Sequence, residues 1–213
     1  MVPSATPIRA LLFDFDEVLA DTEPLHWRAW REVLRPFGID LDWETFEQTC
    51  IGITDTEMLN QLCTLATKPV TPDAIRAHYP EKRQLFRDFA DGRTLIDCKL
   101  IELFKSLAML RLGVVTSSNK SEVEPILLKS GLLDLMNVAV YGNDVRHYKP
   151  HPEPYLLAVQ RLRVAACDTV VFEDSAAGMR SAREAGCRVV QVDDVAQVPA
   201  LVRTAVGEIF SRL

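Results

Sequence analysis

The stretch ALLFDFDEVLADTE, residues 10–23, joins an apolar run directly to a crowd of acidic side chains. The run is continuously apolar up to Phe13, as strands of a parallel sheet are when helices cover both of its faces. Asp14 and Asp16 follow at the end of this predicted strand, two residues apart. Because like charges this close repel each other, the pair needs a compensating partner such as a cation.

Further apolar runs of β type repeat along the chain, with helical patterns between them. We predict strands at residues 9–15, 112–116, 138–141, 169–172 and 188–192. Helical patterns occupy residues 122–130, 154–162, 176–185 and 198–210. Strands that alternate with helices predict an α/β fold, a doubly wound parallel sheet with a Rossmann-like core.

The alternation is interrupted once, after the first predicted strand. From Thr22 to Asp91, apolar residues recur at helical spacing and no convincing strand pattern occurs. We therefore predict an α/β core made of residues 1–21 and 92–213, and an inserted all-helical cap made of residues 22–91.

The composition excludes several classes of function. The formal net charge of -6 argues against non-specific binding to nucleic acid. The N-terminus lacks the pattern of a signal peptide, and no apolar run approaches the roughly 20 residues of a membrane span. The five cysteines show no C-x-x-C spacing, which fits a reducing compartment. We expect a cytoplasmic monomer without a nucleic-acid or membrane partner.

Ligands of open parallel sheets bind beyond the carboxyl ends of the strands. The predicted strand ends carry acids, hydroxyls, an amide and one ammonium group, namely Asp14, Asp16, Thr116, Ser117, Ser118, Asn119, Lys149, Glu173 and Asp174. Carboxylate oxygens are preferred ligands of Mg²⁺, while hydroxyl and ammonium groups suit phosphate oxygens. One carboxylate can then attack phosphorus, and a second can transfer protons.

Four motifs in this order resemble the haloacid dehalogenase superfamily, in its branch of phosphatases and β-phosphoglucomutase-like enzymes with a helical cap. They are Asp14-Phe15-Asp16-Glu17-Val18, Val114-Val115-Thr116, Lys149-Pro150-His151-Pro152 and Glu173-Asp174-Ser175-Ala176-Ala177-Gly178. The resemblance spans essentially the whole chain. It implies a Mg²⁺-dependent phosphatase that acts on a small phosphorylated metabolite through an aspartyl-phosphate.

The resemblance also implies a role for each motif residue. Asp14 is expected as the nucleophile and Asp16 as the general acid/base. The Mg²⁺ ion is expected between the Asp14 carboxylate, the Asp16 backbone carbonyl and Asp174. The phosphoryl group is expected on Thr116, Ser117 and Lys149, with Glu173, Ser118 and Asn119 around them. Because dehalogenating members lack the second aspartate, Asp16 favours phosphoryl transfer.

Glu17 departs from the pattern, since this branch usually has glycine after the second aspartate. Glutamate is harmless there if its φ is negative, but it strains the loop or adds an acid to the site otherwise. Activity lower than the motifs suggest, or a non-catalytic member of the family, would follow.

Simpler interpretations exist for single residues. The acids alone fit an exposed turn, Thr116 and Ser117 fit helix caps, and Lys149 fits a surface lysine; their joint occurrence favours a site. In the cap, the resemblance makes His26 and Lys82 candidates for a role near the substrate, against the alternative of ordinary helix residues. Without a visible third ligand, we interpret His147 and His151 as loop residues.

The cap loop at residues 51–57 contains Asp55 and Glu57 but no lysine or arginine. The mutases of this branch place basic side chains there for a second phosphate, so the loop favours a phosphatase. We expect a singly phosphorylated substrate, either a sugar phosphate or phosphoglycolate. A phosphosugar mutase remains the alternative. A phospho-accepting signalling module is a further alternative, disfavoured because receiver domains are shorter and have no inserted cap.

Overall fold

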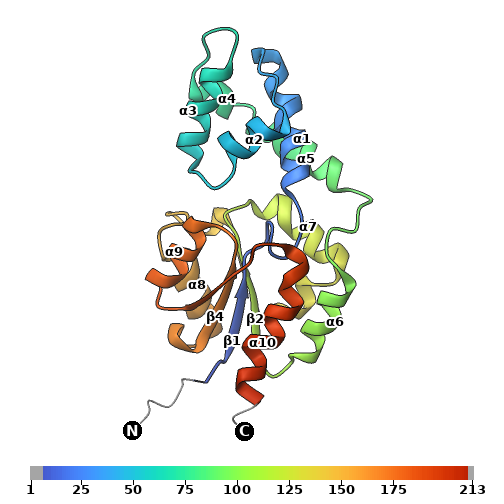
Figure 1. Cartoon of the computed structure of the whole chain (residues 1–213), viewed down its shortest axis with the longest axis vertical. Helices are drawn as coiled ribbons and strands as arrows, with labels where there is room; N and C mark the ends of the chain where they lie inside the picture. Colours follow the sequence, from blue (N-terminus) through green and yellow to red (C-terminus); the bar gives the residue numbers. More distant parts are fainter. Residues whose placement is uncertain (1–6, 211–213) are drawn as a thin grey trace. The chain divides into compact units, whose positions relative to one another are not determined.

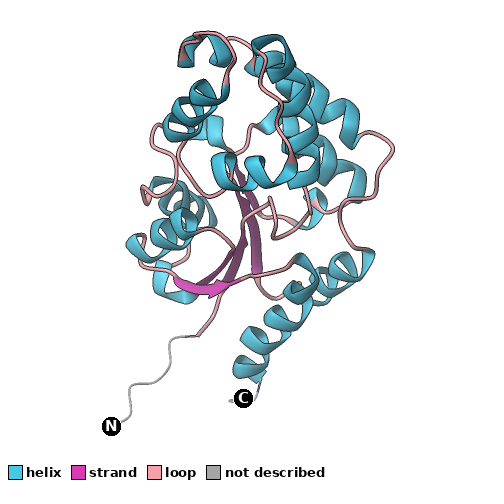
Figure 2. Cartoon of the chain, turned by 45° about the horizontal axis from the view of Figure 1, so that its top comes forward, coloured by secondary structure: helices cyan, strands magenta, loops and turns pink. Residues whose placement is uncertain are grey.

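The computed structural model describes residues 7–210, and a five-stranded parallel sheet forms its centre (Figure 1, Figure 2). The strand order is β3-β2-β1-β4-β5. The strands are β1 (Ala10–Phe13), β2 (Arg111–Val115), β3 (Val138–Val140), β4 (Thr169–Glu173) and β5 (Arg188–Gln191). The prediction of an α/β doubly wound parallel sheet is therefore confirmed.

The register brings the ends of the three central strands to one edge. Phe13, the last residue of β1, pairs with Val114 of β2 and with Phe172 of β4. Polar residues that follow these positions must therefore lie close together, although they come from three distant parts of the chain. This edge carries the candidate site described below.

Helices cover both faces of the sheet. They are α6 (Cys98–Ser106), α7 (Lys120–Ser130), α8 (Glu153–Leu162), α9 (Ala176–Glu184) and α10 (Val198–Phe210). Short 3₁₀ segments connect them at Leu133–Leu135, Gly142–Asp144, Ala166–Asp168 and Val195–Gln197. Helix α6 was not among the predicted helices.

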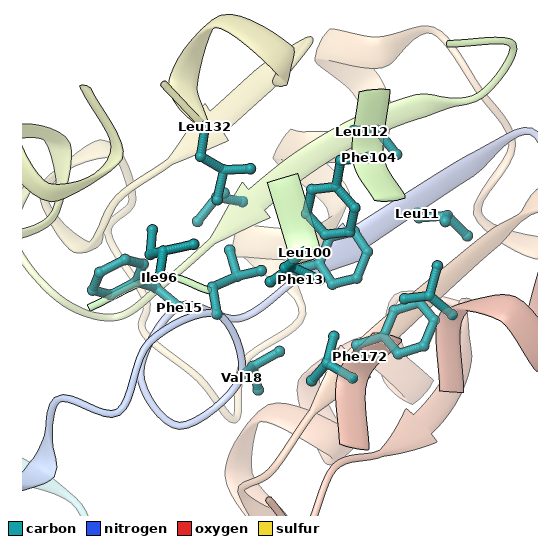
Figure 3. Close-up of a cluster of buried hydrophobic side chains, with 14 of the residues drawn as sticks. Leu11, Phe13, Phe15, Val18, Ile96, Leu100, Phe104, Leu112, Leu132 and Phe172 are labelled. Atoms are coloured by element: carbon teal, nitrogen blue, oxygen red, sulfur yellow. The ribbon is translucent and has the colours of Figure 1, made fainter. Parts of the chain in front are cut away.

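Side chains of β1 alternate between two hydrophobic cores. Leu11 and Phe13 pack with apolar residues of α6, α7 and α10, and Figure 3 shows part of this cluster. Ala10 and Leu12 join a second cluster with residues of α8 and α9. Each of these four side chains is fully buried, which explains why the strand reads as one continuous apolar run.

The described chain divides into two compact units, one made of the residues up to Asp21 together with those from Thr94 onward, and the other of Thr22–Arg93. Helices and a 3₁₀ turn make up the second unit: α1 (Glu23–Leu34), Arg35–Phe37, α2 (Trp43–Cys50), α3 (Asp55–Leu65), α4 (Pro72–Arg76) and α5 (Tyr79–Ala90). They enclose a core of their own that includes Trp30, Phe46 and Leu59.

Side chains at the helix starts define the elements of the second unit. Thr54 and Glu57 form a capping box at the start of α3. Thr71 accepts a hydrogen bond from the backbone of Ala74, and Pro72 follows as the first residue of α4. Across the part of the chain that the structure describes, no helix has both the length and the apolar character needed to cross a membrane.

Candidate active site at the carboxyl edge of the sheet

Asp14 is the first residue after β1, and its backbone N–H donates to the carbonyl of Phe172, 3.0 Å away. The chain then turns tightly, because the carbonyl of Phe15 accepts a hydrogen bond from the backbone N–H of Ala20 at 3.1 Å. The side chains of Phe15 and Val18 are fully buried in the cluster of Figure 3. Apolar anchors thus hold the loop that presents the acidic groups.

Glu17 lies in this loop with a φ of 56°. This is the left-handed region, which costs a residue with a Cβ atom roughly 1–2 kcal/mol and costs glycine little. Of the two possibilities that the sequence left open, the structure therefore shows the strained one.

Lys149 joins three strand ends through one ammonium group. Its Nζ donates to Oδ1 of Asp14 at 2.7 Å, to the carbonyl of Val115 at 2.8 Å and to Oε1 of Glu173 at 2.5 Å. The Lys149 side chain is only 5% exposed. All three ammonium donors are directed to the protein, so the lysine is fixed in the site and is not a surface residue.

Glu173 is the last residue of β4 and is completely buried. Its Oε1 accepts hydrogen bonds from Lys149 and, at 2.7 Å, from the hydroxyl of Tyr155. Its Oε2 accepts from the backbone N–H and the hydroxyl of Ser175, at 3.3 and 3.1 Å. Both oxygens therefore have two donors each, which stabilises an ionised carboxylate in a buried place.

Tyr155 is a site residue that the sequence analysis missed. It lies on α8, is fully buried, and its ring centroid is 5.2 Å from Nζ of Lys149. The available signal was a hydroxyl-bearing residue on the apolar face of a helix that starts just after Lys149.

The structure explains why the fourth motif ends in a glycine, Gly178. A Cβ atom at this position would lie 1.9 Å from Oε1 of Glu173. The backbone N–H of Gly178 also donates to the hydroxyl of Ser175, the residue that caps α9. Only glycine lets the first turn of α9 approach the Glu173 carboxylate this closely.

Asp16 is held by a hydroxyl from the end of β2. The Ser118 hydroxyl donates to Oδ2 of Asp16 at 2.7 Å, and the Thr116 hydroxyl lies 3.5 Å from the same oxygen. Thr116 is buried, whereas Ser117 is exposed. Neither of them caps α7, because Asn119 occupies its N-cap position.

The acids of the site are crowded. One carboxylate oxygen each of Asp14, Glu173 and Asp174 lie within 4.8 Å of one another. Burial raises the pKa of Asp14 well above its usual value, and the neighbouring Glu173 carboxylate adds to this effect. Burial and Glu173 raise the pKa of Asp174 to about 6.

Lys149 offsets only part of this negative charge. Burial alone would lower its pKa, but the Asp14 and Glu173 carboxylates outweigh that effect and raise it. Lys149 therefore stays protonated. The remaining excess of carboxylate oxygens forms a donor set that suits a hard divalent cation such as Mg²⁺.

His26 and Lys82 come together within the second unit. Nζ of Lys82 lies 2.6 Å from Nδ1 of His26, and the His26 ring stacks on Phe86 with centroids 4.3 Å apart. Lys82 is 9% exposed, so it is a buried lysine and not a solvated one on the helix surface. The role of both residues toward a substrate stays a prediction.

The histidines that flank Lys149 also have a partner that the sequence analysis did not consider. Nδ1 of His147 lies 2.7 Å from Oε2 of Glu153, the first residue of α8. His147, His151 and Glu153 form a group of their own outside the acidic cluster.

Comparison with known sequences identifies relatives along most of the chain. The model of the haloacid dehalogenase-like hydrolase family matches residues 11–192. A fructose-1-phosphate phosphatase of Escherichia coli, YqaB, is 31% identical over 183 residues, which cover 85% of this chain and 95% of the relative. A phosphorylated carbohydrates phosphatase of Thermotoga maritima is 32% identical, with coverage of 84% and 82%.

Solved structures show the same architecture. CbbY from Rhodobacter sphaeroides, in complex with phosphate, has a TM-score of 0.72 at 30% identity, with coverage of 85% of this chain and 84% of the other. β-Phosphoglucomutase from Clostridium difficile has a TM-score of 0.77, with coverage of 96% and 98%. At 21% identity, the second likeness shows the fold alone.

Proposed function

Because the chain belongs to the haloacid dehalogenase-like hydrolase family, we propose that it is a Mg²⁺-dependent phosphatase that forms an aspartyl-phosphate on Asp14. It is a phosphatase of phosphorylated sugars and hydrolyses phosphoric monoesters, as its relatives named for these substrates do. The observation that carries the finer proposal is the contact of Lys149 with both Asp14 and Glu173 beside the Asp174 carboxylate.

In the proposed reaction, an oxygen of Asp14 attacks phosphorus while the bond from phosphorus to the sugar oxygen breaks. Asp16 donates a proton to the leaving oxygen and later accepts one from the water that hydrolyses the aspartyl-phosphate. The hydrogen bond from Ser118 supports this role, because it fixes one oxygen of the Asp16 carboxylate beside the end of β2.

The proposed metal ligands are the carboxylates of Asp14 and Asp174 and the backbone carbonyl of Asp16. When bound, Mg²⁺ offsets the negative charge that gathers between these acids and the phosphate. The raised pKa values of Asp14 and Asp174 support the fit, since a cation removes the cost of ionising both. Glu173 is already bonded to four donors, so we assign it to positioning Lys149.

Phosphate oxygens not held by the metal are assigned to Thr116, Ser117 and Lys149. The backbone of Thr116 is fixed, because its N–H donates to the carbonyl of Val140 at 3.0 Å. Ser117 is exposed and therefore accessible to a ligand. Lys149 supplies the positive charge that stabilises the phosphoryl group during transfer.

We infer a singly phosphorylated sugar as substrate rather than a bisphosphate, because residues 51–57 contain acids and no lysine or arginine. Glu57 uses its carboxylate in the capping box of α3, and Asp55 accepts a hydrogen bond from Tyr79. Arg76 lies near Asp55, at 3.6 Å, and is thereby partly neutralised. The segment 51–57 therefore contains acidic side chains and no lysine or arginine that could bind a second phosphate. The nearby Arg76 is already paired with Asp55.

The decisive experiment measures phosphate release from a panel with Mg²⁺: fructose 1-phosphate, glucose 1-phosphate, glucose 6-phosphate and phosphoglycolate. We expect turnover of at least one sugar phosphate, abolished by EDTA and reduced at least about 10³-fold by Asp14→Asn. The exposed Asp134→Asn variant, which makes the same chemical change elsewhere, should retain full activity.

Two results would contradict the proposal. Turnover that survives EDTA and Asp14→Asn would exclude both the metal and the nucleophile. Retention of β-glucose 1,6-bisphosphate, with isomerised product in excess of free phosphate, would establish the mutase instead.

A further inference from the structure

The loop that carries Lys149 also carries two histidines that the proposed phosphatase chemistry does not use. The rings of His147 and His151 lie against each other, with centroids 4.5 Å apart and planes inclined by 31°. Both residues are exposed, and the His147 side chain is 62% exposed. Two imidazoles held together at the surface form a potential chelating pair.

Glu153 adds an oxygen to this pair. Its Oε2 lies 2.7 Å from Nδ1 of His147, while the backbone N–H groups of Arg146 and His147 donate to the carboxylate at 2.9 and 3.1 Å. The backbone bond from Arg146 and the side chain of His147 lower the pKa of Glu153, so it is ionised near neutral pH. One potential ligand atom from each of the three residues lies within 4.8 Å of the others.

We propose that His147, His151 and Glu153 form a second metal site, which binds a divalent transition ion such as Zn²⁺. Two imidazole nitrogens and one carboxylate oxygen are a donor set that Zn²⁺ accepts in proteins, with a fourth position left for water. Mg²⁺ prefers oxygen ligands, so it belongs to the acidic cluster at Asp14 and not here.

The existing hydrogen bonds indicate how the ion would be held. Zn²⁺ takes the place of the proton between Nδ1 of His147 and Glu153, and that proton is released to solvent. His151 gives up the hydrogen bond that its Nδ1 accepts from the backbone N–H of Glu153 at 3.1 Å. The ligand atoms must draw closer, because Zn²⁺ binds nitrogen and oxygen at about 2.0–2.2 Å. The exposure of the two rings permits this movement.

The surroundings leave room for the remaining ligand. A shallow pocket of about 460 Å³ is lined by both histidines together with Arg146, Tyr148 and Arg180. Arg180 does not add an unpaired cation beside the site, because its guanidinium pairs with Glu184 at 2.7 Å. An ion at this place would tie together the chain segments before and after Lys149.

The test is calorimetric titration of the full-length protein with Zn²⁺ in a large excess of Mg²⁺, which keeps the acidic cluster occupied. Three variants are compared with the wild type: His147→Ala, His151→Ala and His78→Ala. His78 is the matched control, because its Nδ1 lies 3.0 Å from Oε2 of Glu81 and, among residues 7–210, this pair belongs to no group of three potential metal ligands. Circular dichroism confirms that each variant is folded.

We expect one Zn²⁺ per chain, with affinity at least about tenfold weaker in His147→Ala and in His151→Ala, and unchanged in His78→Ala. Equal affinity in all four proteins would overturn the proposal, as would the absence of binding to the wild type. A further variant, Asp174→Asn, tests the acidic cluster. Zn²⁺ binding that disappears in this variant but persists in the histidine variants would place the ion in the acidic cluster and would also refute the proposal. Because no outcome depends on turnover, the result is independent of the proposed phosphatase activity.

Discussion

At the scale of single residues, Glu17 has a backbone conformation that residues with a Cβ atom rarely adopt. Its φ of 56° is shared by only one other non-glycine residue in the described part of the chain, Arg163, which follows α8. At such a φ, the Cβ atom lies too close to the backbone and destabilises the folded state, whatever contacts the outer atoms of the side chain make. Glu17→Ala removes the outer atoms of the side chain, and Glu17→Gly also removes the Cβ atom. Comparing the two variants therefore separates the contribution of the Cβ atom from that of the outer atoms.

We predict that Glu17→Gly is more stable than Glu17→Ala by about 1 kcal/mol, because the two differ only in the strained Cβ atom. Denaturant unfolding measures the difference. Arg163→Gly and Arg163→Ala provide the matched pair, with the same φ at an exposed place outside the site. If alanine equals or exceeds glycine in stability at position 17, the loop is not strained. We also expect higher kcat in Glu17→Gly and no change of kcat in Arg163→Gly.

The Tyr155 hydroxyl is a second residue-scale feature with a measurable role. It donates to the same Glu173 oxygen that holds Lys149, so it fixes the ammonium group indirectly. We predict that Tyr155→Phe lowers kcat about tenfold while KM changes less than about twofold, since the hydroxyl acts through Glu173 and Lys149. Steady-state kinetics on the best sugar phosphate measures both values.

Tyr141→Phe is the control for this prediction. Tyr141 is also buried, at 3% exposure, and its hydroxyl lies 3.5 Å from Glu124. A kcat loss of similar size in both variants would show that removing a buried hydroxyl disturbs the fold in general. In that case Tyr155 would have no positioning role.

At the scale of elements, the active edge depends on the close approach of α9 to the end of β4. Gly178 permits this approach, and Ser175 supports it by capping α9 while donating to Glu173. The helix start and the buried carboxylate are therefore parts of one arrangement.

We predict that Gly178→Ala destabilises the protein by about 1–3 kcal/mol and lowers kcat/KM at least tenfold, because the added methyl group displaces the Glu173 carboxylate. Gly207→Ala is the control. It lies in α10, and an added Cβ would meet no atom within 4 Å there, so it should stabilise the helix by up to about 1 kcal/mol. Denaturation midpoints and kinetics of the two variants test the prediction, which fails if Gly178→Ala behaves like its control.

The secondary structure elements differ in how well the sequence predicts them. The continuous apolar runs correctly predicted five parallel strands. Because both faces of the sheet are buried, β1, β2 and β4 have polar residues only at their first or last position, or none. Helix α6 was not predicted; it lies between the predicted cap and the second predicted strand, a stretch to which no element was assigned. The contacts of Tyr155 and Glu153 could not be predicted, since they depend on how α8 packs against the sheet.

At the scale of the whole molecule, the charge state of the acidic cluster links pH, metal and stability. The pKa of Asp174 is raised to about 6, and that of Asp14 is raised well above its usual value. A carboxyl group whose pKa is raised in the folded state stabilises the protein at low pH, and this contribution is lost as pH rises through the folded-state pKa. In the metal-free protein, the stability that Asp174 contributes should therefore be lost as the pH rises from about 4 to about 6. Asp14 should add a loss of stability in the same direction.

Binding of Mg²⁺ to the ionised cluster should restore that stability, because the ion binds the folded state only. We predict that saturating Mg²⁺ raises Tm clearly at pH 7.5 and much less at pH 5, where a proton competes for Asp174. Calorimetric melting curves with and without Mg²⁺ measure this difference. Asp174→Asn should abolish the Mg²⁺ effect at both pH values, whereas the exposed Asp134→Asn should preserve it. A Mg²⁺ effect of equal size at pH 5 and pH 7.5 would mean that the ion does not require an ionised Asp174, and the metal ligands proposed for this site would then have to be reassigned.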